Sequence, residues 1–203
     1  THSQSLQAWL AHIPGIKVVM PATAHDAKGL LLSSIFDNNP VVYLEHRWLH
    51  NLEGDVPEGD YRIPIGKAHR VKEGKDVSII AFSYMTIEAL HAIEVLEKEG
   101  IFCDLIDLRS VSPIDWESIF QSVRKTGRLL VLDTGAATGS IGGEIIARVC
   151  MNCYDSLKQA PQRIALTDYP TPASFSLTKF FYQGAEDIIQ KIIKMLDKTV
   201  SKE

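Results

Sequence analysis

From Asp76 onward the chain alternates between short apolar runs and longer amphipathic stretches. The apolar runs indicate buried strands, and apolar residues spaced three or four apart predict helices. The predicted strands are 77–82, 101–108, 129–132 and 163–166, and the predicted helices are 86–98, 115–124, 144–157 and 185–197. Strands that alternate with helices predict an α/β fold, a doubly wound and mostly parallel sheet covered on both faces.

The first fifty residues carry a shorter version of the same alternation. A short amphipathic helix over 5–12 precedes an apolar run over 17–20, a helix over 23–37 and a second apolar run over 41–44. We expect Thr23 to cap the longer helix, with Asp26 in its first turn opposite the helix dipole. The two strands and their connecting helix form a βαβ unit, whose parallel strands require covering helices.

Two parallel strands make too small a sheet to be stable alone. Residues 1–58 are therefore interpreted as the end of a domain plus a linker, and residues 59–203 as a second, complete domain. A run over 64–71 predicts an edge strand leading into that second domain. On this interpretation we expect the chain to be the carboxyl-terminal part of a larger enzyme subunit.

Composition narrows the class of function. The net charge of −4 argues against nucleic-acid binding, which requires clustered Lys and Arg. Three cysteines do not form a disulfide framework, and this favours a reducing, cytoplasmic location. No apolar run reaches the length of a membrane span. The sequence predicts neither a nucleic-acid nor a membrane partner.

Several residues have side chains that could carry chemistry. His2 lies between two hydroxyl residues and suits acid–base work, although a terminal histidine is more often disordered. The glycine-rich segment Gly135–Gly143 precedes a helix and could hold an anion on its backbone N–H groups. No Gly-Lys-Ser/Thr follows, so a tight packing loop is the more common explanation of this segment.

Three groups of residues invite a metal interpretation. Asp37 to Asn39 at a helix end could offer oxygen ligands to a hard cation, or form an ordinary turn. Cys150 and Cys153 have the spacing of a metal pair but no second pair, and His46 and His50 do not match the metalloprotease pattern. Packed cysteines and solvated histidines are the expected states.

A resemblance rests on blocks that run nearly the whole chain in order. The blocks are Thr1–Gln4, His12–Val19, Asp26–Leu31, Asn39–Val42, Val56–Glu58, Ile63–Ala68, Asp107–Asp115, Ser122–Val131, Gly142–Ile145 and Asp168–Pro172. Taken together, they resemble the beta subunit of thiamine-diphosphate-dependent 2-oxo acid dehydrogenases of the pyruvate and branched-chain type. The resemblance implies the last third of a pyrimidine-binding domain followed by a transketolase C-terminal-like domain.

The resemblance also implies site residues. His2 takes the place of the family's active-site histidine, which handles protons of the acyl intermediate. Ser34 and Asn39, through their backbone carbonyls, and Asp37 take the places of ligands to a monovalent cation, usually potassium. The family's glutamate that activates the cofactor is upstream of Thr1, and the diphosphate of thiamine diphosphate, with its magnesium, is held by the alpha subunit. We therefore expect the chain alone to be inactive and to serve subunit assembly.

The implied partners are an alpha subunit, a second beta subunit, a lipoyl acyltransferase component and a 2-oxo acid substrate. A fragment of a transketolase or deoxyxylulose-phosphate synthase is the alternative, because those enzymes share the Thr-His start and the Pro-Gly-Ile pattern. Ser3, Gln4 and the segment Lys125–Arg128 favour the dehydrogenase. The segments Asp133–Gly135 and Ala173–Gln183 depart from the family pattern, and the second leaves the carboxyl-terminal surface undefined.

Overall fold

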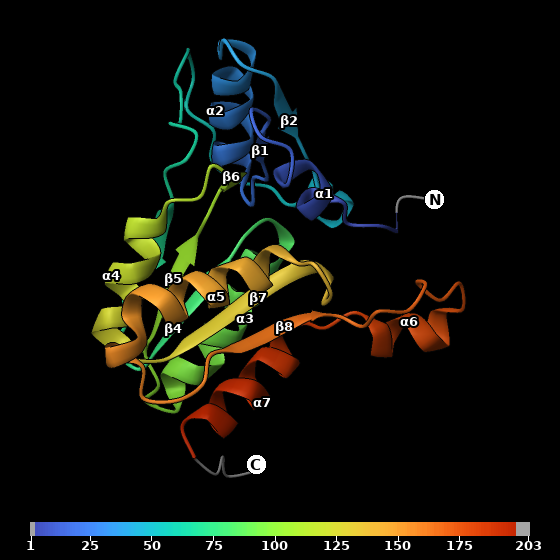
Figure 1. Cartoon of the computed structure of the whole chain (residues 1–203). Coiled ribbons are helices and arrows are strands. Elements are labelled where there is room, and N and C mark those ends of the chain that lie inside the picture. The colour runs from blue at the N-terminus through green and yellow to red at the C-terminus, as the bar shows by residue number, and fades with distance from the viewer. Residues whose placement is uncertain (1–2, 198–203) are drawn as a thin grey trace.

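The computed structural model describes residues 3–197. These residues form a small three-stranded sheet, which contains the first two strands of the chain, and a larger five-stranded sheet (Figure 1). The strands are β1 (Lys17–Val19), β2 (Val41–Tyr43), β3 (His69–Lys72), β4 (Val77–Ala81), β5 (Cys103–Asp107), β6 (Ser110–Ser112), β7 (Leu129–Ala136) and β8 (Gln162–Leu166). The helices are α1 (Gln7–Ala11), α2 (Ala24–Ile35), α3 (Tyr84–Lys98), α4 (Trp116–Thr126), α5 (Ile141–Cys153), α6 (Phe175–Phe181) and α7 (Ala185–Met195). Two short 3-10 helices, η1 (Arg47–Asn51) and η2 (Tyr154–Ser156), complete the list.

The larger sheet has the strand order β3-β5-β4-β7-β8. Its last four strands are mutually parallel, and β3 pairs antiparallel with β5 at the edge. Helices α3 and α7 pack against one face, and α4 and α5 against the other (Figure 1). The predicted doubly wound, mostly parallel sheet is therefore confirmed, including the edge strand that opens the second half.

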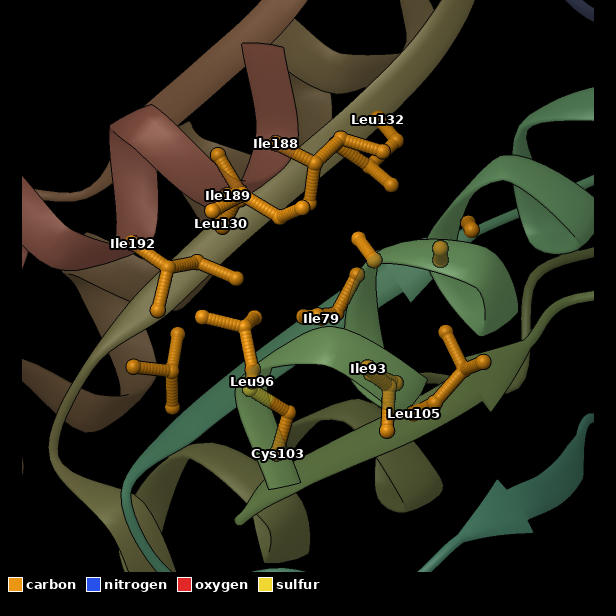
Figure 2. Close-up of a cluster of buried hydrophobic side chains, with 14 of the residues drawn as sticks. Ile79, Ile93, Leu96, Cys103, Leu105, Leu130, Leu132, Ile188, Ile189 and Ile192 are labelled. Carbon is orange, nitrogen blue, oxygen red and sulfur yellow. The ribbon is translucent and has the colours of Figure 1, made fainter. Parts of the chain in front are cut away.

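A dry apolar core lies between this sheet and the pair α3 and α7. Figure 2 shows side chains of both helices meeting those of β4, β5 and β7. Ile79, Leu96, Leu105 and Ile192 are fully buried there. Leucine and isoleucine at helical spacing produce this interface because each helix buries a single apolar stripe.

The helix ends follow local chemistry. The Thr23 hydroxyl accepts a hydrogen bond from the Asp26 backbone N–H at 3.1 Å, so the predicted cap of α2 is confirmed. Gly127 ends α4 with a φ of +73°, a left-handed conformation that glycine adopts without a Cβ penalty. The cap of α2 was readable from the sequence because a cap depends on neighbouring residues alone.

The smaller sheet contains a strand that the sequence pattern did not predict. Strands β1 and β2 are parallel and joined through α2, as the βαβ interpretation requires. The third strand, β6, comes from the second half of the chain and pairs antiparallel with β1. The two-stranded unit is therefore completed from within the chain, and the two halves share a sheet.

The carboxyl-terminal segment adds one feature beyond the predicted elements. Helix α6 projects away from both sheets (Figure 1), and its Phe175 and Phe180 are 86% and 79% exposed. No helix within residues 3–197 has the length and apolar character needed to cross a membrane.

Candidate functional site

A cavity of about 690 Å³ lies where the N-terminal unit meets the larger sheet. Strands β4 and β7 are neighbours in that sheet, but the chain leaves β4 toward β5 on one side and later returns to β7 on the other. Doubly wound sheets bind ligands outside the carboxyl ends of strands at such a reversal of strand order. Residues at or just after those ends, Tyr84 and Met85 after β4 and Asp133 and Thr134 in β7, line the cavity.

Asp133 organises the floor of the cavity. Its carboxylate accepts hydrogen bonds from the backbone N–H groups of Gly135 and Gly142, both at 2.9 Å, and from Gln7 Nε2 at 2.9 Å. The side chain is 2% exposed, and burial raises the pKa of Asp133 while these three donors oppose the rise. A single buried carboxylate thus joins β7, α5 and α1.

The same geometry decides the role of the glycine-rich segment. Two of its N–H groups are bound to Asp133, and the Gly143 N–H donates to the Ser140 hydroxyl, which caps α5, at 3.1 Å. Because internal acceptors already occupy these donors, the segment does not present them to an external anion. The interpretation as a strand-to-helix packing loop is confirmed.

An aromatic wall faces the cavity from three separate segments. His46 stacks on Tyr84 with ring centroids 4.9 Å apart, and Trp48 makes edge contacts with both Tyr84 and Tyr182. Burial, aided by the nearby His50, lowers the pKa of His46, and its Nδ1 accepts the Trp48 backbone N–H at 3.3 Å. The His46 ring is therefore neutral near pH 7 and has one nitrogen already committed to η1.

The N-terminal segment forms the remaining wall. Ser3, Gln4 and Ser5 line the cavity, and Gln7 at the start of α1 is 1% exposed. His2, the predicted catalytic residue, precedes these residues and lies outside the described range. The cavity is nevertheless bordered by Ser3 to Ser5, the residues that directly follow His2 in the sequence. Its volume is typical of a small-molecule site.

The predicted cation ligands lie at the end of α2, away from this cavity. The Asp37 carboxylate accepts hydrogen bonds from Lys17 Nζ at 2.5 Å and from the Asn39 backbone and side-chain amides at 2.9 and 3.0 Å. The Lys17 ammonium, with the Asn39 donors, lowers the pKa of Asp37 to about 2. The Ser34 carbonyl accepts a longer bond, 3.4 Å, from the Asp37 N–H.

This arrangement limits what could hold a cation there. The Asp37 carboxylate is paired with an ammonium and closes the turn, so three of its roughly four acceptor positions are occupied. The backbone carbonyls of Ser34 and Asn39 fit the oxygen chemistry of a monovalent cation better. The cation site itself stays a prediction.

Within residues 3–197, no group of three or more His, Cys, Asp and Glu side chains is arranged to hold a metal ion. Cys153 is buried on α5, and Cys150 on the same helix is partly exposed. His50 approaches the Glu45 carboxylate at 3.7 Å on an exposed surface. Cys153 agrees with the expectation of a packed cysteine and His50 with that of a solvated histidine, whereas His46 is half-buried against Tyr84 and so differs from the expectation.

A second buried polar cluster joins the two halves of the chain behind the cavity. Asp26 of α2 is 2% exposed and receives two hydrogen bonds from the Arg109 guanidinium, both at 2.7 Å. Arg109 adopts a φ of +60° between β5 and β6, and its carbonyl accepts the Met20 N–H at 2.8 Å. Asp26 therefore does more than oppose a helix dipole, since it anchors α2 to the second half.

Sequence reasoning missed this pair and also Gln7. Asp26 and Arg109 are 83 positions apart, and no local pattern links them. For Gln7 a weak signal existed, because a polar residue lies among the apolar positions of a short amphipathic helix. A buried polar side chain at such a position requires a specific partner.

Comparison with known proteins supplies the family. The model of the transketolase C-terminal domain matches residues 66–188, and that of the transketolase pyrimidine-binding domain matches residues 1–51. A solved split-gene transketolase, described as an inactive beta4 tetramer, superposes with a TM-score of 0.76 at 25% identity, covering 94% of this chain and 60% of that chain.

Curated relatives are more similar in sequence. The chain is 43% identical over 187 residues to the beta subunit of acetoin:2,6-dichlorophenolindophenol oxidoreductase of Cupriavidus necator, covering 92% of this chain and 55% of the relative. It is 42% identical over 198 residues to the pyruvate dehydrogenase E1 component subunit beta of Porphyra purpurea, covering 98% and 60%. It is 41% identical over 201 residues to the mitochondrial 2-oxoisovalerate dehydrogenase subunit beta 2 of Arabidopsis thaliana, covering 98% and 54%.

The chain spans about half the length of the curated relatives that it matches. Within that span the order of the two domain models agrees with the order of the two sheets along the chain. With more than half of its residues matched by one model, the chain belongs to the transketolase C-terminal domain family, and its amino-terminal part matches the pyrimidine-binding domain of transketolase.

Proposed function

We propose that the chain serves as the carboxyl-terminal part of the beta subunit of a thiamine-diphosphate-dependent 2-oxo acid dehydrogenase. The reaction is oxidative decarboxylation of a 2-oxo acid with acyl transfer to a lipoyl group. The observation that carries the proposal is identity of 41–43% to beta subunits over nearly the whole chain. The division at residue 58 and the cytoplasmic location belong to the same proposal.

The chain's own residues have limited roles in this proposal. His2 moves protons during acyl transfer, and the backbone carbonyls of Ser34 and Asn39 hold potassium with the turn fixed by Asp37. In the family that the chain resembles, the magnesium diphosphate end of the cofactor lies outside the part of the beta subunit that this chain matches. That end is assigned to the alpha subunit, and thiamine diphosphate supplies the carbanion chemistry when it is bound.

Inactivity of the chain alone is the first testable consequence. Calorimetry of the chain with thiamine diphosphate and magnesium should detect no tight binding, because the diphosphate ligands lie elsewhere. Micromolar affinity would contradict the assignment of those ligands to the alpha subunit.

The activity requires the intact beta subunit, co-expressed with its alpha subunit and assayed with 2-oxo acids and a lipoyl acceptor. We expect turnover that falls strongly in His2→Ala while the assembly elutes unchanged from size-exclusion chromatography. Unchanged turnover in His2→Ala would remove the role given to His2.

A ketol transferase of the transketolase type is the second candidate. The split-gene transketolase supports it through the fold, although its identity of 25% is well below that of the dehydrogenase beta subunits. Assaying the same complex with ketose phosphate donors distinguishes the two, since only a ketol transferase would consume them.

The partners of the chain are an alpha subunit, a second beta subunit and the lipoyl acyltransferase component. The large aromatic side chains Trp9 on α1 and Phe175 and Phe180 on α6 are between 76% and 86% exposed. Exposed apolar side chains of this size are typical of surfaces that subunits cover. Sedimentation of the isolated chain should therefore show self-association, as in the inactive beta4 tetramer of the split-gene transketolase.

A further inference from the structure

We propose that Gln7 is a positioning residue, which fixes the segment next to His2 against the carboxyl edge of the larger sheet. The inference rests on the proposed function, because only that function gives the segment a part in catalysis. Gln7 touches no reacting group in this proposal. It acts by holding Ser3 to Leu6 in place as one wall of the cavity.

Helix α1 cannot fix this segment by itself. It has five residues, its first turn lacks a side-chain cap, and its largest side chain, Trp9, is 76% exposed. Isolated helices of this length are unstable in water. An attachment to the rest of the molecule must therefore determine where the segment lies.

Gln7 provides such an attachment through its side-chain amide. Gln7 Nε2 donates to Asp133 Oδ1 at 2.9 Å and lies 3.2 Å from Thr134 Oγ1. Both acceptors belong to β7, which lies inside the sheet between β4 and β8. A bond from a buried amide to a buried carboxylate is stronger than one between neutral groups, and it orients the helix as well as holding it.

Two backbone N–H groups hold the Asp133 carboxylate in the orientation that accepts the bond from Gln7. The Gly135 and Gly142 N–H groups hold its two oxygens, one each, so the carboxylate cannot turn away when Gln7 is removed. When Gln7 is removed, the Asp133 carboxylate loses one of its three hydrogen-bond donors and keeps the Gly135 and Gly142 N–H groups.

Gly135 leaves space for the Gln7 side-chain amide because it has no Cβ. A Cβ at position 135 would lie 2.9 Å from Gln7 Nε2 and 3.3 Å from Asp133 Oδ1. Gly135 does not have a positive φ, so a side chain there is excluded by the contact with Gln7 and not by backbone strain. Gly135→Ala therefore displaces the Gln7 amide without changing Gln7 itself.

Hydrogen exchange of the chain tests the attachment without any enzyme assay. In Gln7→Met and in Gly135→Ala, the amides of Leu10 and His12, which are bonded within α1, should exchange at least about tenfold faster. The amides of β7 should keep their protection, which shows that both variants fold. Gln190→Met, which removes an exposed glutamine bonded to Glu186, is the matched control and should change neither set. Unchanged exchange in α1 in both variants would overturn the proposal.

Kinetics of the assembled alpha–beta enzyme test the catalytic consequence. A displaced wall should lower kcat about tenfold in Gln7→Met, with a smaller change in KM, while Gln190→Met matches the wild type. If the variants loosen α1 and kcat stays unchanged, the positioning role is overturned. If α1 loosens but the wild-type complex does not turn over 2-oxo acids, the proposed function fails and the attachment of α1 stands as a structural role only.

Discussion

The contact of the larger sheet with helices α3 and α7 differs from the contact of α2 with the second half, which contains a buried ion pair as well as apolar packing. Between the sheet and helices α3 and α7 the contact is apolar and fully buried, with side chains such as Ile79, Leu96 and Ile192 (Figure 2). Between α2 and the second half, Asp26 and Arg109, two buried charges joined by two hydrogen bonds, add to the apolar packing of Leu30 against Ile63. Apolar burial is non-directional and shared among many atoms, whereas the charged contact is directional and responds to pH.

The difference predicts two kinds of failure. Damage to the apolar core removes contacts that every strand of the larger sheet shares, so unfolding should stay cooperative. Damage to the charged contact leaves that core intact and loosens the N-terminal unit, which is also attached through β6, α1 and the apolar packing of Val18 and Met20 with Ile80 and Phe82. Stability should therefore be lost locally in the second case.

The largest effect is expected from Leu96→Ala. Leu96 is fully buried between α3 and α7, and its truncation should destabilise the chain by about 4 kcal/mol through lost burial and a residual cavity. Urea denaturation followed by circular dichroism measures this change. Val95→Ala on the same helix, at a 45% exposed side chain, should cost less than about 1 kcal/mol, and equal losses in the two variants would contradict the dry core.

Arg109→Met should have the second largest effect, about 3 kcal/mol, because the buried Asp26 carboxylate loses both guanidinium bonds and keeps only His25 Nδ1, at 3.0 Å, as a side-chain partner from outside its own cap. Hydrogen exchange should show protection lost first in α2 and β1, while β4 and β7 remain protected. Arg148→Met, which breaks an exposed pair with Glu144, is the control and should cost about 0.5 kcal/mol or less. A uniform loss of protection across both sheets would contradict the local attachment.

The elements that sequence reasoning predicted are those determined by neighbouring residues. The apolar stripe of α7 and the Thr23 cap each depend on a few positions close in sequence. The alternation of strands and helices then restricts the topology of the larger sheet to a few options. This is why the fold of the second half could be predicted almost completely.

The features that it missed depend on contacts between distant parts of the chain. Strand β6 has three residues and pairs outside the sheet of its sequence neighbours, so no periodicity marks it. The partners Asp26 and Arg109, and likewise Gln7 and Asp133, are ordinary polar residues until the fold brings them together. The cavity is built from these same long-range contacts, and its position could not be predicted from the sequence alone.

Asp107 makes the charged contact sensitive to pH. Its carboxyl is 1% exposed and accepts the Arg109 backbone N–H at 3.1 Å, while the Arg109 guanidinium is taken by Asp26. Burial, with a further contribution from the nearby Asp26 charge, raises the pKa of Asp107 to about 7. In the unfolded chain the same carboxyl has its ordinary pKa of 3.8.

The sign of the effect on stability follows from these two values. Between pH 3.8 and about 7 the folded chain binds a proton at Asp107 that the unfolded chain has lost, so stability falls as the pH rises. From pH 5 to pH 6.5 the loss should be about 2 kcal/mol, since each pH unit in this window is worth about 1.4 kcal/mol. His46 and His69, whose pKa values burial lowers, oppose this trend near pH 6.

The comparison with Asp107→Asn isolates the smallest of the three effects. Asparagine keeps the acceptor for the Arg109 N–H but cannot ionise, so the contributions of His46, His69 and Asp133 cancel between the two proteins. The free energy of unfolding of the wild type minus that of Asp107→Asn should fall by about 2 kcal/mol from pH 5 to pH 6.5. A difference that stays constant with pH would contradict the prediction, because it would mean that Asp107 is ionised throughout the window. The Asp26 and Asp107 carboxylates would then both be charged and buried next to the Arg109 guanidinium.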